Sequence, residues 1–171
     1  MIRCRALPTR RRRPLRWSGC PIPAEGGAAI PRGASPLPPF LGVSRASAVY
    51  RGAAACAACH PAATARWEAS AHAHAIGALE EAQRAFDPSC LRCHVTGLGH
   101  PGGFRSHNET PGLVGVGCEA CHGPASDHLA APGPGYGDLP LDGSACVGCH
   151  THDNSPDFSW ARYWPQVKHS H

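Results

Sequence analysis

The chain has 171 residues and a formal net charge of +4, with 20 glycines, 18 prolines and only 4 Phe, 4 Trp and 3 Tyr. That length allows one domain, but the few bulky side chains exclude a conventional hydrophobic core of matching size. No apolar run approaches the roughly 20 residues that a transmembrane helix needs, so we expect no membrane span.

The positive charge is confined to the beginning of the chain. Ten arginines lie at or before Arg51, whereas the residues after it carry 6 basic and 11 acidic side chains, a balance of −5. The run from Arg10 to Arg13 belongs to this first segment and gives little support to nucleic-acid binding. We therefore expect an acidic body and no nucleic-acid partner.

Residues 1–48 are rich in Arg, Pro, Gly and Ala and show no apolar periodicity. Such a composition cannot bury enough surface to order a chain, so we expect a disordered leader followed by a domain over residues 49–171. A basic stretch, a weak apolar patch at 38–43 and Ala46-Ser47-Ala48 outline an export signal. A misplaced start codon that translates upstream sequence explains the segment equally well.

The first element expected in the domain is one helix of about twenty residues, from Pro61 to about Phe86. This segment is Ala-rich, begins with a proline and ends before Asp87-Pro88. Its length and composition would make it the longest helix of the chain.

The sequence of the rest of the domain predicts loops and one more helix. Glycine and proline recur over residues 97–117, which indicates a loop with a short hairpin around Gly102-Gly103-Phe104. Residues 131–143 are also a predicted loop, and residues 158–167 a short final helix. The predicted fold class is mainly α, with short helices, extensive loops and little or no sheet.

Four copies of Cys-x-x-Cys-His recur in this domain, and each is the attachment signal of a c-type heme. The paired cysteines are Cys56 and Cys59, Cys90 and Cys93, Cys118 and Cys121, and Cys146 and Cys149, followed by His60, His94, His122 and His150. Two thiols one turn apart bond to the porphyrin, and the histidine becomes the proximal ligand of the iron. The sequence therefore predicts four c-type hemes, with porphyrins serving as the core.

Paired cysteines also occur in zinc sites and in disulfides. Four pairs could form two zinc sites, but zinc does not require a histidine directly after the second cysteine. A thioredoxin-like redox motif is accompanied by a βαβ pattern, which this sequence lacks. Both alternatives are weaker than heme attachment.

The single methionine, Met1, lies in the leader, so the domain offers no methionine as a sixth iron ligand. Methionine ligation raises the potential of c-type hemes, and two histidines give low potentials. Each iron is expected to be bis-histidine, to keep an open position or to recruit an unusual ligand. Eight further histidines are available: His72, His74, His100, His107, His128, His152, His169 and His171. Spacing alone does not pair them with hemes.

The residues around the motifs follow a recognisable order. They read Tyr50-x-Gly52 and Trp67-x-x-Ser70-x-His72-Ala73, then Thr96-Gly97-Leu98-Gly99 and Gly102-Gly103-Phe104, then Leu113-x-Gly115-Val116-Gly117 and Gly123-Pro124, with His128 just after. This order resembles the cytochrome c-554 type of tetraheme cytochromes over residues 49–171.

The resemblance implies three pairs of histidines across an iron: His60 with His128, His150 with His72, and His122 with His169, for which His171 is the alternative. In the family the second heme, here at His94, has no sixth ligand from the protein. His100 and His107 lie in the loop after this motif, where either would close the open position. The sequence is compatible with both alternatives, a second heme with a vacant sixth position and one closed by a histidine.

Family members accept electrons from hydroxylamine oxidation, so the resemblance implies an electron carrier between redox partner proteins, such as other cytochromes or quinol-linked complexes. Because c-type hemes are attached outside the bacterial cytoplasm, we expect a periplasmic or otherwise exported protein. An acidic body favours brief, salt-sensitive docking. The alternative is a heme-dependent oxidoreductase of nitric oxide, nitrite or hydroxylamine at an open second heme, with His100, His107 or Arg105 as a proton source.

Overall fold

A computed structural model of the chain describes residues 48–140 and 142–169, all of which fall in one compact unit. The predicted leader and its export signal lie outside the described residues and stay predictions. Within the described ranges, no helix is both long enough and apolar enough to cross a membrane.

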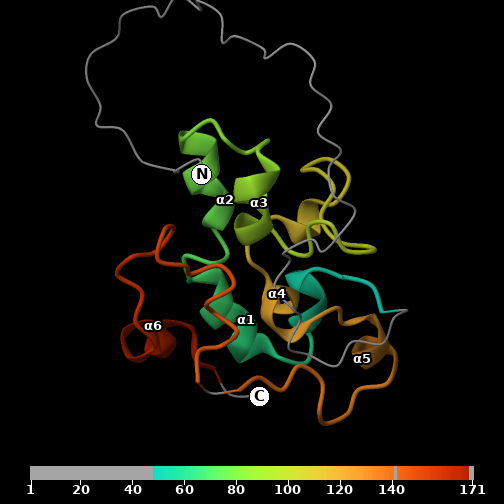
Figure 1. Cartoon of the computed structure of the whole chain (residues 1–171). Coiled ribbons are helices and arrows are strands. Elements are labelled where there is room, and N and C mark those ends of the chain that lie inside the picture. The colour runs from blue at the N-terminus through green and yellow to red at the C-terminus, as the bar shows by residue number, and fades with distance from the viewer. Residues whose placement is uncertain (1–47, 141, 170–171) are drawn as a thin grey trace, which may run out of the picture. The chain divides into compact units, whose positions relative to one another are not determined.

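The described residues form short helices joined by turns and loops (Figure 1). In chain order the elements are η1 (Ala53–Cys56), α1 (Pro61–Glu68), α2 (Ala75–Glu81), α3 (Pro88–His94), η2 (Pro111–Leu113), α4 (Cys118–His122), α5 (Ser126–Ala130) and α6 (Trp160–Val167). Extended pairing is represented by an isolated antiparallel bridge between Val95 and Val114. The predicted fold class, mainly α with extensive loops, is confirmed.

The single long helix predicted from Pro61 to about Phe86 is wrong, because the chain breaks it into α1 and α2. The amide and the hydroxyl of Ser70 both donate to the Trp67 carbonyl, at 2.8 and 2.6 Å, and end α1. The carbonyl of His72 then accepts the amide of Val116 at 2.9 Å. This bond to a distant segment holds the turn open, and such tertiary contacts override helix propensity.

The hairpin predicted around Gly102-Gly103-Phe104 is also wrong, because the segment forms successive turns. The amide of Phe104 donates to the Thr96 carbonyl and that of Gly103 to the His100 carbonyl, both at 3.0 Å. A Cβ on Gly103 would lie 1.8 Å from the carbonyl oxygen of Gly97. The loop therefore closes on its own backbone and leaves no room for two paired strands.

The apolar core is small and lies around α2 and α3, which pack side by side (Figure 1). Its buried members are Tyr50, Leu79, Cys90, Leu91, Val95, Phe104 and Leu113. The start of α3 is fixed by Asp87, whose carboxylate accepts the amide of Ser89 at 2.9 Å, and by Pro88 at the first helical position. This core supports the second heme motif directly.

A chain produced without heme attachment is expected to be largely unfolded. Seven side chains make up the buried apolar cluster of the described unit, too few to offset the conformational entropy of the chain. Far-UV circular dichroism of protein made in a compartment that lacks the attachment machinery measures this, with the heme-loaded protein as the reference. A cooperative, native-like melting curve of the heme-free chain would contradict the expectation.

Candidate heme sites

Each Cys-x-x-Cys-His motif is wound into one helical turn. The second motif ends α3 and the third is the whole of α4. In the first and fourth motifs the histidine amide donates to the carbonyl of the first cysteine, Cys56 or Cys146, at 2.9 Å in both. Residues three and four apart lie on one side of such a turn, so each motif presents two sulfurs and an imidazole together.

All eight motif cysteines are free thiols, as attachment to a porphyrin requires. Thiols of different motifs also contact one another. Cys56 shares a hydrogen bond with Cys118, which raises the pKa of Cys56. The hydrogen bond from Cys149 lowers the pKa of Cys93 to about 6. These contacts place the first motif beside the third and the second beside the fourth.

The structure brings together the three histidine pairs that the sequence analysis expected. The ring centres of His60 and His128 lie 6.3 Å apart. Those of His72 and His150 lie 6.1 Å apart, and those of His122 and His169 lie 5.8 Å apart. Each pair joins a motif histidine to one from a distant segment.

These separations match two imidazoles on opposite sides of one metal ion. A metal–imidazole bond is about 2 Å long and the ring centre lies roughly 1 Å beyond the nitrogen, which places the two centres about 6 Å apart. The angles between ring planes differ widely, at 27°, 46° and 63°. Rotation of the two rings about a shared nitrogen–metal–nitrogen axis would change the angle between their planes but keep the distance between their centres.

Hydrogen bonds on Nδ1 leave the other ring nitrogen available to a metal. The Nδ1 atoms of His94, His122 and His169 lie 2.6, 2.7 and 3.0 Å from the carbonyl oxygens of Ala75, Gly137 and Val167. A carbonyl only accepts, so each Nδ1 carries the proton and each Nε2 keeps a lone pair. Such second bonds orient histidine ligands in metal sites.

His72 and His74, two residues apart, have different surroundings. Burial lowers the pKa of His72, and so does neighbouring His150, which favours the neutral imidazole that binds metals. The Nε2 of His74 instead donates to the carbonyl of Glu68 at 3.0 Å, so this nitrogen is occupied. The turn between α1 and α2 thus directs His72, and not His74, toward a heme motif.

The surroundings of His94 differ from those of the other three motif histidines. Of the two alternative sixth ligands named for this heme, His107 lies 3.8 Å from the carboxylate of Glu80, and the ring centre of His100 lies 6.5 Å from that of Tyr50. Within residues 48–140 and 142–169, no ring contact of His94 is found. His152 is exposed, and His171 lies outside the described residues.

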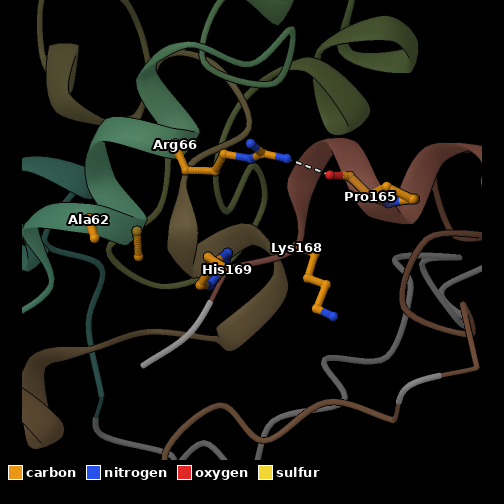
Figure 2. Close-up of a pocket in the computed structure, with 6 residues that line it drawn as sticks. Ala62, Arg66, Pro165, Lys168 and His169 are labelled. Atoms are coloured by element: carbon orange, nitrogen blue, oxygen red, sulfur yellow. Dashed lines mark hydrogen bonds between the residues drawn. The ribbon is translucent and has the colours of Figure 1, made fainter.

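A shallow hollow of about 480 Å³, open to solvent, lies beside His169. It is lined by Ala62, Ala63, Arg66, Pro165, Lys168 and His169. Figure 2 shows Arg66 of α1 donating to the carbonyl of Pro165 in α6, with the His169 side chain below this bond. Small alanine walls suit a flat porphyrin, and the cations of Arg66 and Lys168 suit its carboxylates.

Sequence reasoning missed several residues that hold these sites together. Glu119, inside the third motif, is 1% exposed and accepts backbone amides from Arg51, Gly52 and Ala125 at 2.7 to 3.0 Å. The ring of Phe158 stacks on His150 at 4.6 Å. Gly137 contacts His122 of the third motif, and Tyr136 contacts Gly123 and His128, from a loop to which the sequence assigned no function. The one sequence feature that could have indicated the role of this loop is Tyr136, an aromatic residue among glycines and prolines.

Helical turns with paired thiols and facing histidines define a multiheme c-type cytochrome. Residues 55–123 match the family described as cytochrome c554 and c-prime. Cytochrome c-554 of Nitrosomonas europaea is 39% identical in a match that covers 46% of this chain and 40% of that protein. The matched part of the chain is similar to cytochromes of the c-554 type, which supports c-type heme binding.

The reduced state of cytochrome c554 from Nitrosomonas europaea is a similar solved structure, with 35% sequence identity and a TM-score of 0.43. This match covers 48% of the present chain and 47% of that chain. The chain therefore matches less than half the length of these relatives.

Proposed function

We propose that the protein is an electron-transfer protein that carries four low-potential c-type hemes. The observation that carries the proposal is the near-equal separation, 5.8 to 6.3 Å, of three histidine pairs that each include a motif histidine. When bound, heme takes up and releases one electron at its iron. The chain supplies the attachment turns and the facing imidazoles.

Contacts between the motifs support a continuous route for electrons. The first motif touches the third through Cys56 and Cys118, and the fourth touches the second through Cys149 and Cys93. Cys121 of the third motif lies close enough to Cys146 of the fourth for Cys146 to raise its pKa, after burial, to about 11. Along this route the motifs follow one another in the order first, third, fourth and second.

The ligand set supports low reduction potentials. Two imidazoles per iron give lower potentials than an imidazole and a methionine thioether, and the one methionine of the chain is Met1. Filled ligand positions also suit a carrier, because the iron changes charge without exchanging a ligand. His60, His122 and His150 each face a second histidine that would fill such a position.

The acidic balance after Arg51 suits docking to basic patches of redox partners such as other cytochromes or quinol-linked complexes. Such encounters are brief and weaken with salt. Because c-type hemes are attached outside the cytoplasm, we place the protein in the periplasm or a comparable exported location. The relative is named as a cytochrome, which agrees with a carrier function.

A second candidate function is reduction of a small nitrogen compound at the heme of His94. The Nδ1 of His94 is bound to Ala75 at 2.6 Å, which leaves Nε2 for the iron on one side. The two histidines nearest in sequence beyond the motif have other neighbours, Glu80 for His107 and Tyr50 for His100. An iron held this way would have one position for nitric oxide, nitrite or hydroxylamine.

Intact mass spectrometry and spectroscopy of the heme-loaded protein test both functions. We expect the mass of four hemes added to the chain, low-spin bis-histidine spectra from three of them, and salt-sensitive electron exchange with a partner cytochrome. Fewer hemes, or high potentials throughout, would contradict the carrier function. Carbon monoxide binding at one heme would support the second candidate, and its failure to bind at any heme would exclude that candidate.

A further inference from the structure

Two consecutive residues of the 131–143 loop form a brace against the end of the third heme motif. The Nδ1–H of His122 donates to the carbonyl of Gly137 at 2.7 Å. In return, the hydroxyl of Tyr136 donates to the carbonyl of Gly123, the residue that follows His122. Two hydrogen bonds between two pairs of adjacent residues fix this part of the loop in both position and orientation.

The same loop residues reach a second histidine. The ring of Tyr136 stacks on that of His128 with centres 4.5 Å apart and an angle of 11° between the planes. His128 also lies opposite His60, with ring centres 6.3 Å apart. Tyr136 therefore covers one face of an imidazole that points toward the first motif, while its neighbour Gly137 binds an imidazole of the third motif.

Residue 137 needs to be glycine. Gly137 has φ +67°, and a Cβ there would lie 2.6 Å from Cβ and 2.7 Å from Nδ1 of His122. Gly137 is also buried, in a loop whose residues are mostly exposed. Gly135, two residues earlier, has φ +86°, but a Cβ there would meet no atom within 4 Å, so its backbone is similar and its surroundings are open.

We propose that Tyr136 and Gly137 are positioning residues for axial ligands of two hemes, His128 of the first and His122 of the third. The inference rests on the proposed function, which makes these histidines ligands. The Gly137 carbonyl holds the proton on Nδ1 of His122, directs Nε2 toward the iron and increases the basicity of the imidazole. The Tyr136 ring limits rotation of His128 about its side chain.

A more basic ligand stabilises the oxidised iron, so the bond from His122 to Gly137 lowers the potential of the third heme. Gly137→Ala is expected to push His122 off this carbonyl and to raise that potential, with altered low-spin g-values for the same heme. Gly135→Ala, which adds the same methyl group at a similar backbone angle without touching His122, is expected to leave both unchanged. Redox titration with electron paramagnetic resonance of the four-heme protein measures these changes.

Two variants of Tyr136 separate its contacts. Tyr136→Phe keeps the ring on His128 and removes the hydrogen bond to Gly123. We therefore expect the electron paramagnetic resonance signal of the first heme to be unchanged and that of the third heme to change. Tyr136→Leu removes the ring as well and is expected to change both. The heme content of every variant is measured first, so that loss of a heme is told apart from a shifted signal.

The spectrum that belongs to the third heme is identified independently with His169→Ala, which removes its other ligand. If Gly137→Ala matches the wild type in potential and g-values while His169→Ala alters them, the brace is overturned and the proposed function stands. If His169→Ala also changes nothing, the ligand assignment itself fails. A change in Gly137→Ala with none in Gly135→Ala supports the brace.

Discussion

Replacing Glu119 by alanine is expected to lower the free energy of unfolding of the heme-loaded protein by about 3 kcal/mol or more, since a buried amide without an acceptor costs about 1–3 kcal/mol. The carboxylate of Glu119 accepts four hydrogen bonds from the backbone of Arg51, Gly52 and Ala125. The amides of Gly52 and Ala125 would be left buried without an acceptor, and the half-buried bond from the Arg51 amide would be lost as well. Denaturant unfolding followed by heme absorbance and by circular dichroism measures the loss.

Glu81→Ala is the matched control, because Glu81 is exposed at the end of α2 and a surface substitution there changes stability by about 0.5 kcal/mol at most. Glu119→Gln gives a second comparison. It keeps the size of the side chain but turns an NH₂ group toward the amides, so it should destabilise as well. Stability of Glu119→Ala within the range of the Glu81 control would show that the carboxylate is dispensable.

The second large effect is expected from His72→Met. A thioether in place of the imidazole should raise the potential of the fourth heme by on the order of 0.1 V, well inside the ~0.8 V range that axial ligands span. The ring of His72 faces His150 at 6.1 Å, so under the proposed function only the heme at His150 should shift in potential. Redox titration resolves this, and near-infrared absorption reports methionine ligation.

His74→Met provides the control at almost the same place in the chain. The Nε2 of His74 donates to the Glu68 carbonyl and its side chain is exposed, so this variant should keep all four wild-type potentials. Equal shifts in the two variants would mean that the effect arises from the turn and not from ligation. No shift in His72→Met would remove His72 from the ligand set.

The heme motifs could be predicted from sequence because their geometry is local. Cysteines three residues apart followed by a histidine need one helical turn, and the structure supplies that turn in α3, in α4 and in two shorter segments. The pairing of His72, His128 and His169 with the motifs could not be derived from spacing. It came from the resemblance, because a contact between distant segments leaves no periodic pattern.

The parts that sequence reasoning missed depend on tertiary contacts. The break between α1 and α2 is held by Val116, which lies far along the chain, and an Ala-rich segment gives no sign of it. Glu119 stands at a variable position of its motif, where a charged residue suggests solvent exposure. Gly137 could be recognised only once its neighbour His122 was known, since the loop contains two other glycines with positive φ, Gly135 and Gly143.

The contacts between motifs also set a limit on how the chain can be divided. The segment closed by Cys56 and Cys118 contains Cys93, and the segment closed by Cys93 and Cys149 contains Cys118. The two closed loops therefore interlace. No single cut leaves two fragments that each retain their own contact, so the domain should assemble as one cooperative unit and not as two independent halves. A fragment that ends at residue 123 would keep the first loop and leave Cys93 facing water.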